Sequence, residues 1–124
     1  MKFMMIVKGA EDFGTAGPPP QSLMEAIDKL GQEATKAGKM VTMGGLQPTS
    51  KGASLRLKGG KIITKDGPFT EAKEMIGGFT ILELPSKEAA IEEARKFMEL
   101  HRIHWPGWEG ETEIREMYEN GEHP

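Results

Sequence analysis

The chain has 124 residues, of which 37% are hydrophobic and 28% charged, and this composition is typical of one soluble globular domain over residues 1–124. Its net charge of −3 argues against non-specific nucleic-acid binding, and no apolar run approaches the roughly 20 residues that a membrane helix needs. The lack of cysteine excludes disulfides and cysteine–zinc sites, and with no apparent signal peptide we expect a cytoplasmic protein.

The first part of the chain predicts a strand, a loop, a helix and a second strand. Residues 2–8 are apolar in the middle and closed by lysines, which indicates a buried strand. After a loop with three consecutive prolines, a helix is expected over residues 21–37, and Gly38 would end it. Residues 39–43 predict the second strand. The apolar stripe of the helix recurs at helical spacing: Leu23, Ile27, Leu30, Ala34 and Ala37.

A β-hairpin is expected from residues 53–58 and 61–65, because Gly59-Gly60 suits a two-residue primed turn. The register pairs Leu55 with Thr64, Arg56 with Ile63, Leu57 with Ile62 and Lys58 with Lys61. The surrounding residues 39–65 hold six basic and no acidic side chains, whereas acids outnumber bases by eleven to five from Glu83 onward. The basic segment could guide an anionic ligand, or it could keep the hairpin solvated and discourage edge-to-edge pairing.

The last part of the chain predicts a core strand, a helix and a final strand. Side chains of the strand at residues 75–84 alternate between two sides: Phe79 and Ile81 on one, and Thr80, Leu82 and Leu84 on the other. Ser86 would cap a helix that runs to about residue 103, and residues 113–119 predict the last strand. The order β-α-β, hairpin, β-α-β predicts an α+β, ferredoxin-like fold with both helices on one face of a mainly antiparallel sheet.

The other face of such a sheet would lack cover within one chain. A second copy is the simplest cover for an apolar sheet face, so we expect a homodimer built on it. Several of the nine methionines lie in or beside the predicted strands, where they suit an interface or simply fill the core. Trp105 and Trp108 are expected in the core or the dimer seam, with an aromatic pocket as the alternative.

Residues 66–74, Asp-Gly-Pro-Phe-Thr-Glu-Ala-Lys-Glu, resemble the signature of the DGPF branch of the YCII-related family. Other segments resemble that family too: the first strand at residues 2–8, Gly44-Gly45-Leu46-Gln47-Pro48, Gly77-Gly78-Phe79, and His104-Trp105-Pro106 with Glu113-Ile114-Arg115. The resemblance implies a ferredoxin-like fold paired into a dimeric α+β barrel. It also implies a family whose biochemical role is largely undefined, within a wider group that includes isomerases, lyases and monooxygenases.

Asp66-Gly67-Pro68 is a strong turn signal, in which Gly67 would supply a positive φ and Pro68 a fixed one. Asp66 would therefore end a strand, and near the apolar wall of Phe69 its carboxylate could have a raised pKa and move protons. Alternatively, the carboxylate orders its own turn by accepting bonds from backbone N–H groups. Three charged residues that follow are either ligand-binding groups or surface ions: Glu71, Lys73 and Glu74.

His101 and His104 lie three residues apart near the end of the second helix, so both could face one side. One of them could partner Asp66 in acid–base chemistry, and the family resemblance also implies a His–Asp pair without assigning the histidine. The alternative is that the two rings stabilise the C-terminus of the helix. No third ligand follows at a recognisable spacing, so we expect no metal site and no cofactor.

Two functions follow as hypotheses. The first is a cofactor-free acid–base enzyme of lyase or isomerase type acting on a small anionic organic molecule. Asp66 and His104 would move protons and Arg56 or Lys65 would hold the anion, a hypothesis that leans on the resemblance to the dimeric barrel group. The alternative is a non-catalytic ligand-binding or regulatory accessory protein. A pocket that contains Asp66 and a histidine would favour the enzyme, and a solvent-exposed Asp66 bonded only to its own turn would favour the accessory protein.

Overall fold

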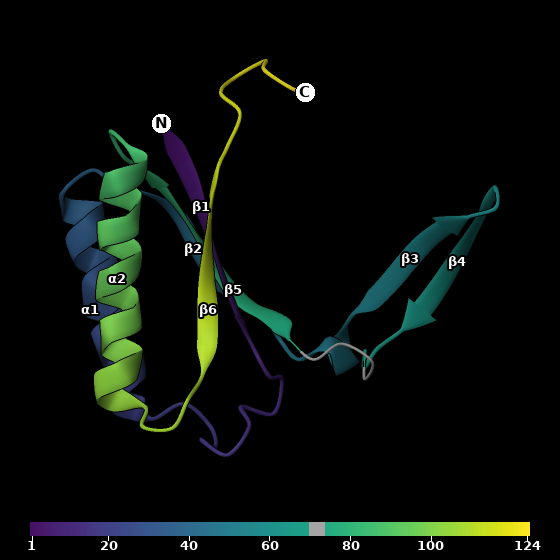
Figure 1. Ribbon diagram of the computed structural model, residues 1–124, viewed down its shortest axis with the longest axis horizontal. Helices are drawn as coiled ribbons and strands as arrows, with labels where there is room; N and C mark the ends of the chain where they lie inside the picture. Colours follow the sequence, from purple (N-terminus) through teal and green to yellow (C-terminus); the bar gives the residue numbers. More distant parts are fainter. Residues whose placement is uncertain (70–73) are drawn as a thin grey trace.

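Two helices cover one face of a four-stranded sheet in the computed structural model, which describes residues 1–69 and 74–124 (Figure 1). The elements in chain order are β1 (Lys2–Gly9), α1 (Gln21–Lys36), β2 (Met40–Gly45), a 3-10 turn η1 (Thr49–Lys51), β3 (Ala53–Lys58), β4 (Lys61–Asp66), β5 (Met75–Glu83), α2 (Lys87–His104) and β6 (Gly110–Glu116). This order confirms the predicted α+β, ferredoxin-like plan with an inserted hairpin.

The helix-facing side of the sheet forms the core. The strand order is β2-β5-β1-β6, and every pair in this sheet is antiparallel. Leu82 and Leu84 are buried, whereas Phe79 and Ile81 are half-buried on the opposite face, so the predicted alternation is confirmed. The buried cluster joins strand and helix residues: Phe3, Met5, Leu82, Leu84, Ala90 and Ala94.

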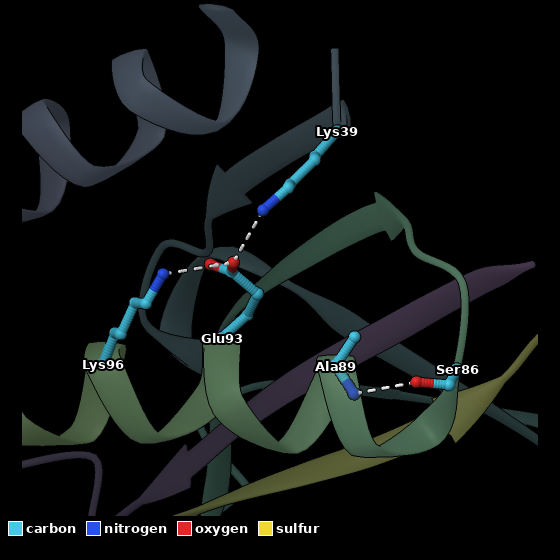
Figure 2. A network of polar contacts seen from close by, with 5 residues as sticks. All are labelled: Lys39, Ser86, Ala89, Glu93 and Lys96. Atoms are coloured by element: carbon cyan, nitrogen blue, oxygen red, sulfur yellow. Dashed lines mark hydrogen bonds and ion pairs between the residues drawn. The ribbon is translucent and has the colours of Figure 1, made fainter. Parts of the chain in front are cut away.

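Three polar contacts, made by Ser86 and Glu93, stabilise the first part of helix α2 and its packing (Figure 2). Ser86 Oγ accepts a hydrogen bond from the backbone N–H of Ala89 at 3.1 Å, which is the predicted cap. One turn later, the largely buried carboxylate of Glu93 pairs with Lys39 at 3.3 Å and with Lys96 at 3.4 Å. The first of these pairs ties α2 to the residue that precedes β2. Neither α1 nor α2, the helices of the described residues, has the length and apolar character needed to cross a membrane.

The final strand begins three residues earlier than expected. β6 pairs with nearly the whole of β1, from Gly9 opposite Gly110 to Phe3 opposite Glu116, so it starts directly after the turn that follows α2. Repeated acidic residues make this strand look polar in the sequence, and pairing with β1 overrides that local pattern. The other predicted helices and strands agree with the structure to within two residues at each end.

The hairpin of β3 and β4, residues 53–66, forms a separate two-stranded sheet, and we call it the arm. Its predicted register is confirmed at all four pairs. Figure 1 shows the arm extending away from the rest of the molecule, on the side of the four-stranded sheet opposite the helices. We call the two helices and the four-stranded sheet the body.

Candidate functional site

A cavity of about 500 Å³ lies where the ends of several elements meet. Its walls come from the end of β1 and the loop after it, the first half of α1, the loop after β2, the first half of β5 and the end of α2. Exposed side chains of Met24, Asp28 and Met43 form part of the lining, so a ligand can reach it from solvent. A smaller recess of about 40 Å³ between helices and sheet shares Ile27 and Phe97 with it.

His101, in the last turn of α2, is a buried titratable residue of this cavity, with 5% of its surface exposed. Its Nδ1 lies 2.9 Å from the backbone carbonyl oxygen of Phe97, one helical turn earlier. Because a carbonyl oxygen only accepts, Nδ1 must carry the proton and donate it. Nε2 is then the acceptor of the neutral ring, and it makes no hydrogen bond within residues 1–69 and 74–124.

Burial lowers the pKa of His101 from its ordinary value of 6.5, because the charged ring would lose hydration at this position. The hydrogen bond to the Phe97 carbonyl opposes that shift but is the smaller effect. The ring is therefore neutral at pH 7. A neutral imidazole with a fixed tautomer and an unused nitrogen is the form that can take a proton from a neighbouring molecule.

Aromatic rings surround His101. The ring centroids of Phe97 and Trp108 lie 4.5 Å and 4.6 Å from that of His101. Trp105 stacks on Trp108 at 5.4 Å with planes 12° apart, and Phe13, from the loop after β1, packs on Trp105 at 5.3 Å. The ring nitrogen Nε1 of Trp105 is buried with no hydrogen-bond partner among the described residues. An unpaired buried donor costs about 1–3 kcal/mol, so an acceptor that reached this N–H would stabilise the site.

Glu11, in the loop after β1, ties two walls of the cavity together. Its carboxylate accepts hydrogen bonds from the backbone N–H of Thr49 and from Thr49 Oγ1, the second at 2.9 Å. Thr49 Oγ1 in turn accepts a hydrogen bond from the backbone N–H of Phe69 at 3.1 Å. The turn at residues 66–69 is thus fastened, through Thr49, to the wall that contains Glu11.

Gly67 is required by close packing rather than by its backbone conformation. Its φ lies outside the left-handed region, so the expected positive φ was wrong. A Cβ on Gly67 would lie 1.6 Å from the carbonyl oxygen of Thr49, far inside any permitted contact. The Gly67 N–H donates to the carbonyl of Gly52 at 3.0 Å, and the bond between Gly67 and Pro68 is cis. The glycine therefore allows the turn to dock on Thr49.

Asp66 lies at the end of β4 and is exposed. In the described part of the chain its carboxylate makes no hydrogen bond and no ion pair, so it does not order its own turn by accepting from backbone N–H groups. Asp66 is also absent from the residues that line the cavity, so one chain does not bring it together with His101 there. Neither of the two arrangements that would distinguish the hypotheses is present in the described chain, because Asp66 shares no cavity with His101 and its carboxylate is not bonded to its own turn.

The other predicted site residues in the described chain also lie outside the cavity lining: Arg56 and Lys65 on the arm, Phe69 and Glu74 on either side of residues 70–73, and His104 at the end of α2. Glu71 and Lys73 fall within residues 70–73, outside the described residues. Of the predicted set, the cavity contains His101. Within residues 1–69 and 74–124 no group of three or more His, Asp or Glu side chains is arranged to hold a metal ion.

One part of this site, the aromatic wall around His101, has a recognisable pattern in the sequence. Phe97, His101 and Trp105 are spaced four residues apart, which places them on one face of a helix and predicts an aromatic wall around the histidine. Glu11 and Thr49 had no such signal, because 38 residues separate them and only the fold brings them together.

The fold and the cavity together define a ferredoxin-like α+β protein with an aromatic-walled cavity at one end of its core. The model of the YCII-related domain matches residues 1–99, and the chain belongs to the YCII-related family. It is similar to an uncharacterised protein of Rhizobium meliloti (strain 1021), with 33% identity over 75 residues. Those residues make up 60% of this chain and span 60% of that relative's length. His101, Trp105 and Trp108 lie beyond the residues that the family model matches.

Proposed function

We propose that this protein binds a small, largely apolar organic molecule in the cavity, and that Nε2 of His101 accepts a hydrogen bond or a proton from it. The observation that carries the proposal is a buried, neutral His101 whose Nδ1 is held by Phe97 and whose Nε2 has no partner in the described chain. The volume of about 500 Å³ supports it, because small-molecule sites typically enclose roughly 300–1,000 Å³.

The lining favours an apolar body with one N–H or O–H donor. Aromatic and aliphatic side chains form most of the wall, and such surfaces bind apolar groups by removing them from water. Two charged residues of the lining are already occupied, since Lys8 pairs with Glu113 and Glu11 holds Thr49. Lys8 is therefore not free to hold a carboxylate, Glu11 would repel one, and the cations predicted to hold an anion lie on the arm. We therefore propose a neutral or weakly acidic ligand.

A neutral fluorescent probe of apolar cavities, N-phenyl-1-naphthylamine, which carries one N–H donor, tests this proposal. Ile27→Trp would fill the cavity, because Ile27 lines both the cavity and the adjoining recess. Gln32→Trp adds the same ring to the exposed side of α1, outside both linings, and is the matched control. We expect the Ile27 variant to bind the probe at least about tenfold more weakly than the control. Equal affinities in the two variants would place the probe elsewhere and overturn the proposal.

The second candidate function is proton transfer by His101, which the fixed tautomer of its neutral ring favours. In this reaction Nε2 removes a proton from a carbon beside a carbonyl group, and the electron pair moves to the carbonyl oxygen as an enolate. Return of the proton to another carbon, or loss of a leaving group, would give an isomerase or a lyase. Asp66 has no part in this form of the hypothesis, because it does not line the cavity of its own chain.

Phenylacetone, a neutral molecule with an apolar ring and exchangeable methylene protons beside a ketone, is a suitable probe for proton transfer. In deuterium oxide, the wild type should speed the loss of its methylene proton signal, measured by NMR, and His101→Gln should not. If phenylacetone binds but exchanges at the rate seen in buffer, catalysis by His101 is contradicted and the binding function stands. If it exchanges equally fast in the His101 variant, another group is the base.

A further inference from the structure

A recess of about 40 Å³ between the helices and the sheet adjoins the cavity that contains His101. The ring centroid of Phe97, which lines both spaces, lies 4.5 Å from that of His101. The shared wall therefore begins directly beside the histidine, and a molecule whose polar group meets His101 has the recess within reach of its other end. The residues that line both spaces are Val7, Ile27, Met43, Thr80 and Phe97.

The recess runs along both helices, away from His101. On α2, Phe97 lines the recess and the cavity, whereas Glu93, one turn earlier, lines the recess alone. On α1, Ile27 lines both spaces, whereas Ala34, two turns later, lines the recess alone. Glu93 and Ala34 therefore mark the end of the recess that is remote from the cavity.

The recess exists because α1 presents small residues to the sheet at this level. Gly31 and Ala34 are three residues apart and so lie on one face of the helix. A Cβ on Gly31 would lie 3.0 Å from Sδ of Met43, so the glycine gives that thioether room. A larger side chain at Ala34 would occupy the space that the alanine leaves. The wall also includes three flexible methionines that can adapt to a guest: Met5, Met40 and Met43.

The polar side chains that line the recess alone already have partners. The carboxylate of Glu93, which is 12% exposed, pairs with Lys39 at 3.3 Å and with Lys96 at 3.4 Å (Figure 2). Thr112 Oγ1 donates a hydrogen bond to Sδ of Met98 at 3.1 Å. The other residues that line the recess alone are apolar: Met5, Leu30, Gly31, Ala34, Met40 and Leu82. Such a wall favours a hydrocarbon group, which requires no hydrogen bond.

The sizes of the two spaces limit what each can hold. A sphere of the size of water or of a methylene group takes roughly 10–15 Å³, so the 40 Å³ of the recess hold about three such groups in a row. The cavity is more than tenfold larger, and its aromatic side chains, Trp105 and Trp108 among them, favour a ring that can stack on them. Together the two spaces fit an aromatic head and a short, thin tail.

We propose that the ligand is an aromatic molecule with one O–H or N–H donor and, on the opposite side of the ring, an unbranched alkyl tail of about three or four carbon atoms. The donor meets Nε2 of His101, the ring lies among the aromatic side chains of the cavity, and the tail enters the recess. Gly31 and Ala34 then determine the width and length of the tail that fits. The inference rests on the proposed function, because it names the class of ligand for the same cavity.

Two phenols of equal composition, 4-n-butylphenol and 4-tert-butylphenol, test the tail. Both remain neutral donors at pH 7, because a phenol loses its proton near pH 10. Isothermal titration calorimetry of the wild type should show that the unbranched isomer binds at least about tenfold more tightly. From 4-methylphenol to 4-n-butylphenol, each added methylene should tighten binding about threefold to fourfold, and 4-n-hexylphenol should gain little more.

Ala34→Leu should remove this preference, because the new side chain would fill the recess and Ala34 does not line the cavity. The two butyl isomers should then bind within about threefold of each other, whereas the affinity for 4-methylphenol should stay within about twofold of the wild type. Ala37→Leu adds the same side chain at an exposed position outside both linings and should keep the preference. Circular dichroism checks the fold, and Ala34→Val, which adds one carbon fewer, replaces a Leu variant that misfolds.

The outcomes separate this inference from the function on which it rests. Equal affinities of the butyl isomers for the wild type, a preference that Ala34→Leu leaves unchanged, or an equal loss of preference in Ala34→Leu and Ala37→Leu would each overturn the tail. Binding of 4-methylphenol that weakens at least about tenfold in His101→Gln would leave the proposed function standing in all three cases. If the wild type binds none of these phenols, the proposed function and the inference drawn from it are both contradicted.

Discussion

The body and the arm are built from similar strands and differ in what covers them. In the body, Phe3 points toward the helices while its neighbours Lys2 and Met4 point to the other face of the sheet, and Phe3 is 1% exposed because α2 lies over it. In the arm, Leu57 alternates in the same manner and is 72% exposed. The alternation of a strand therefore shows which side is suited to burial, but not whether the cover comes from the same chain.

The largest expected effect is the difference between a core substitution in the body and an equivalent substitution in the arm, measured as the loss in free energy of unfolding. Phe3→Ala should lower the free energy of unfolding by about 3–5 kcal/mol, because it leaves a cavity in the packed core. Leu57→Ala should change it by less than about 0.5 kcal/mol, because this side chain is 72% exposed. Chemical denaturation measures both. Similar losses would mean that the arm is part of the folding core, contrary to its exposure.

The next effect concerns the junction between the two regions. Gly67→Ala should lower the free energy of unfolding by about 1–3 kcal/mol, because the new methyl group would overlap the carbonyl oxygen of Thr49. Gly77→Ala is the control, since a Cβ there meets no atom within 4 Å and its φ is not left-handed. Thermal unfolding of the two variants compares them. A Gly67 variant as stable as the control would show that the turn at residues 66–69 can move away from Thr49 without lowering the free energy of unfolding.

A pH titration tests the cavity of the body. Because burial lowers the pKa of His101 below 6.5, the unfolded chain binds its proton more tightly than the folded one. The stability due to the neutral ring is complete above pH 6.5 and is lost as the pH falls below it, by at most about 1.4 kcal/mol per pH unit. His101→Gln should lose this slope, as denaturation at several pH values would reveal. Parallel profiles for the two proteins would contradict a lowered pKa.

The smallest effect is expected at Asp66, on the arm. Its exposed carboxylate has no hydrogen bond in the described chain, so Asp66→Asn should change the free energy of unfolding by less than about 0.5 kcal/mol. Chemical denaturation of this variant and the wild type measures the difference. A loss of about 1 kcal/mol or more would show instead that the carboxylate of Asp66 stabilises its own turn.

The sequence predicted the elements and the arm well because those signals are local. Gly59-Gly60 set the hairpin register, and Ser86 marked the start of α2, both through contacts within a few residues. The start of β6 was misplaced because its partner, β1, is about 100 residues away and determines where pairing begins. Register across distant strands depends on the whole sheet rather than on a short pattern.

The candidate site was predicted less well for the same reason. His101 was identified by its residue type, but its burial and fixed tautomer depend on the carbonyl of Phe97 and on rings that the fold collects around it. The motif at residues 66–69 drew attention to Asp66, whereas the structure shows that Gly67 is the residue with a steric requirement. The described part of the motif packs on Thr49, a contact that the local sequence did not reveal.

The stacked pair of tryptophans has a spectroscopic consequence. Trp105 and Trp108 are the two tryptophans of the chain, and both line the cavity next to His101. The indole emission of the folded protein therefore originates at one place, with no background from elsewhere in the chain. Displacement of water from the cavity and protonation of the neighbouring imidazole would each alter that emission, so the native protein carries its own unlabelled optical sensor.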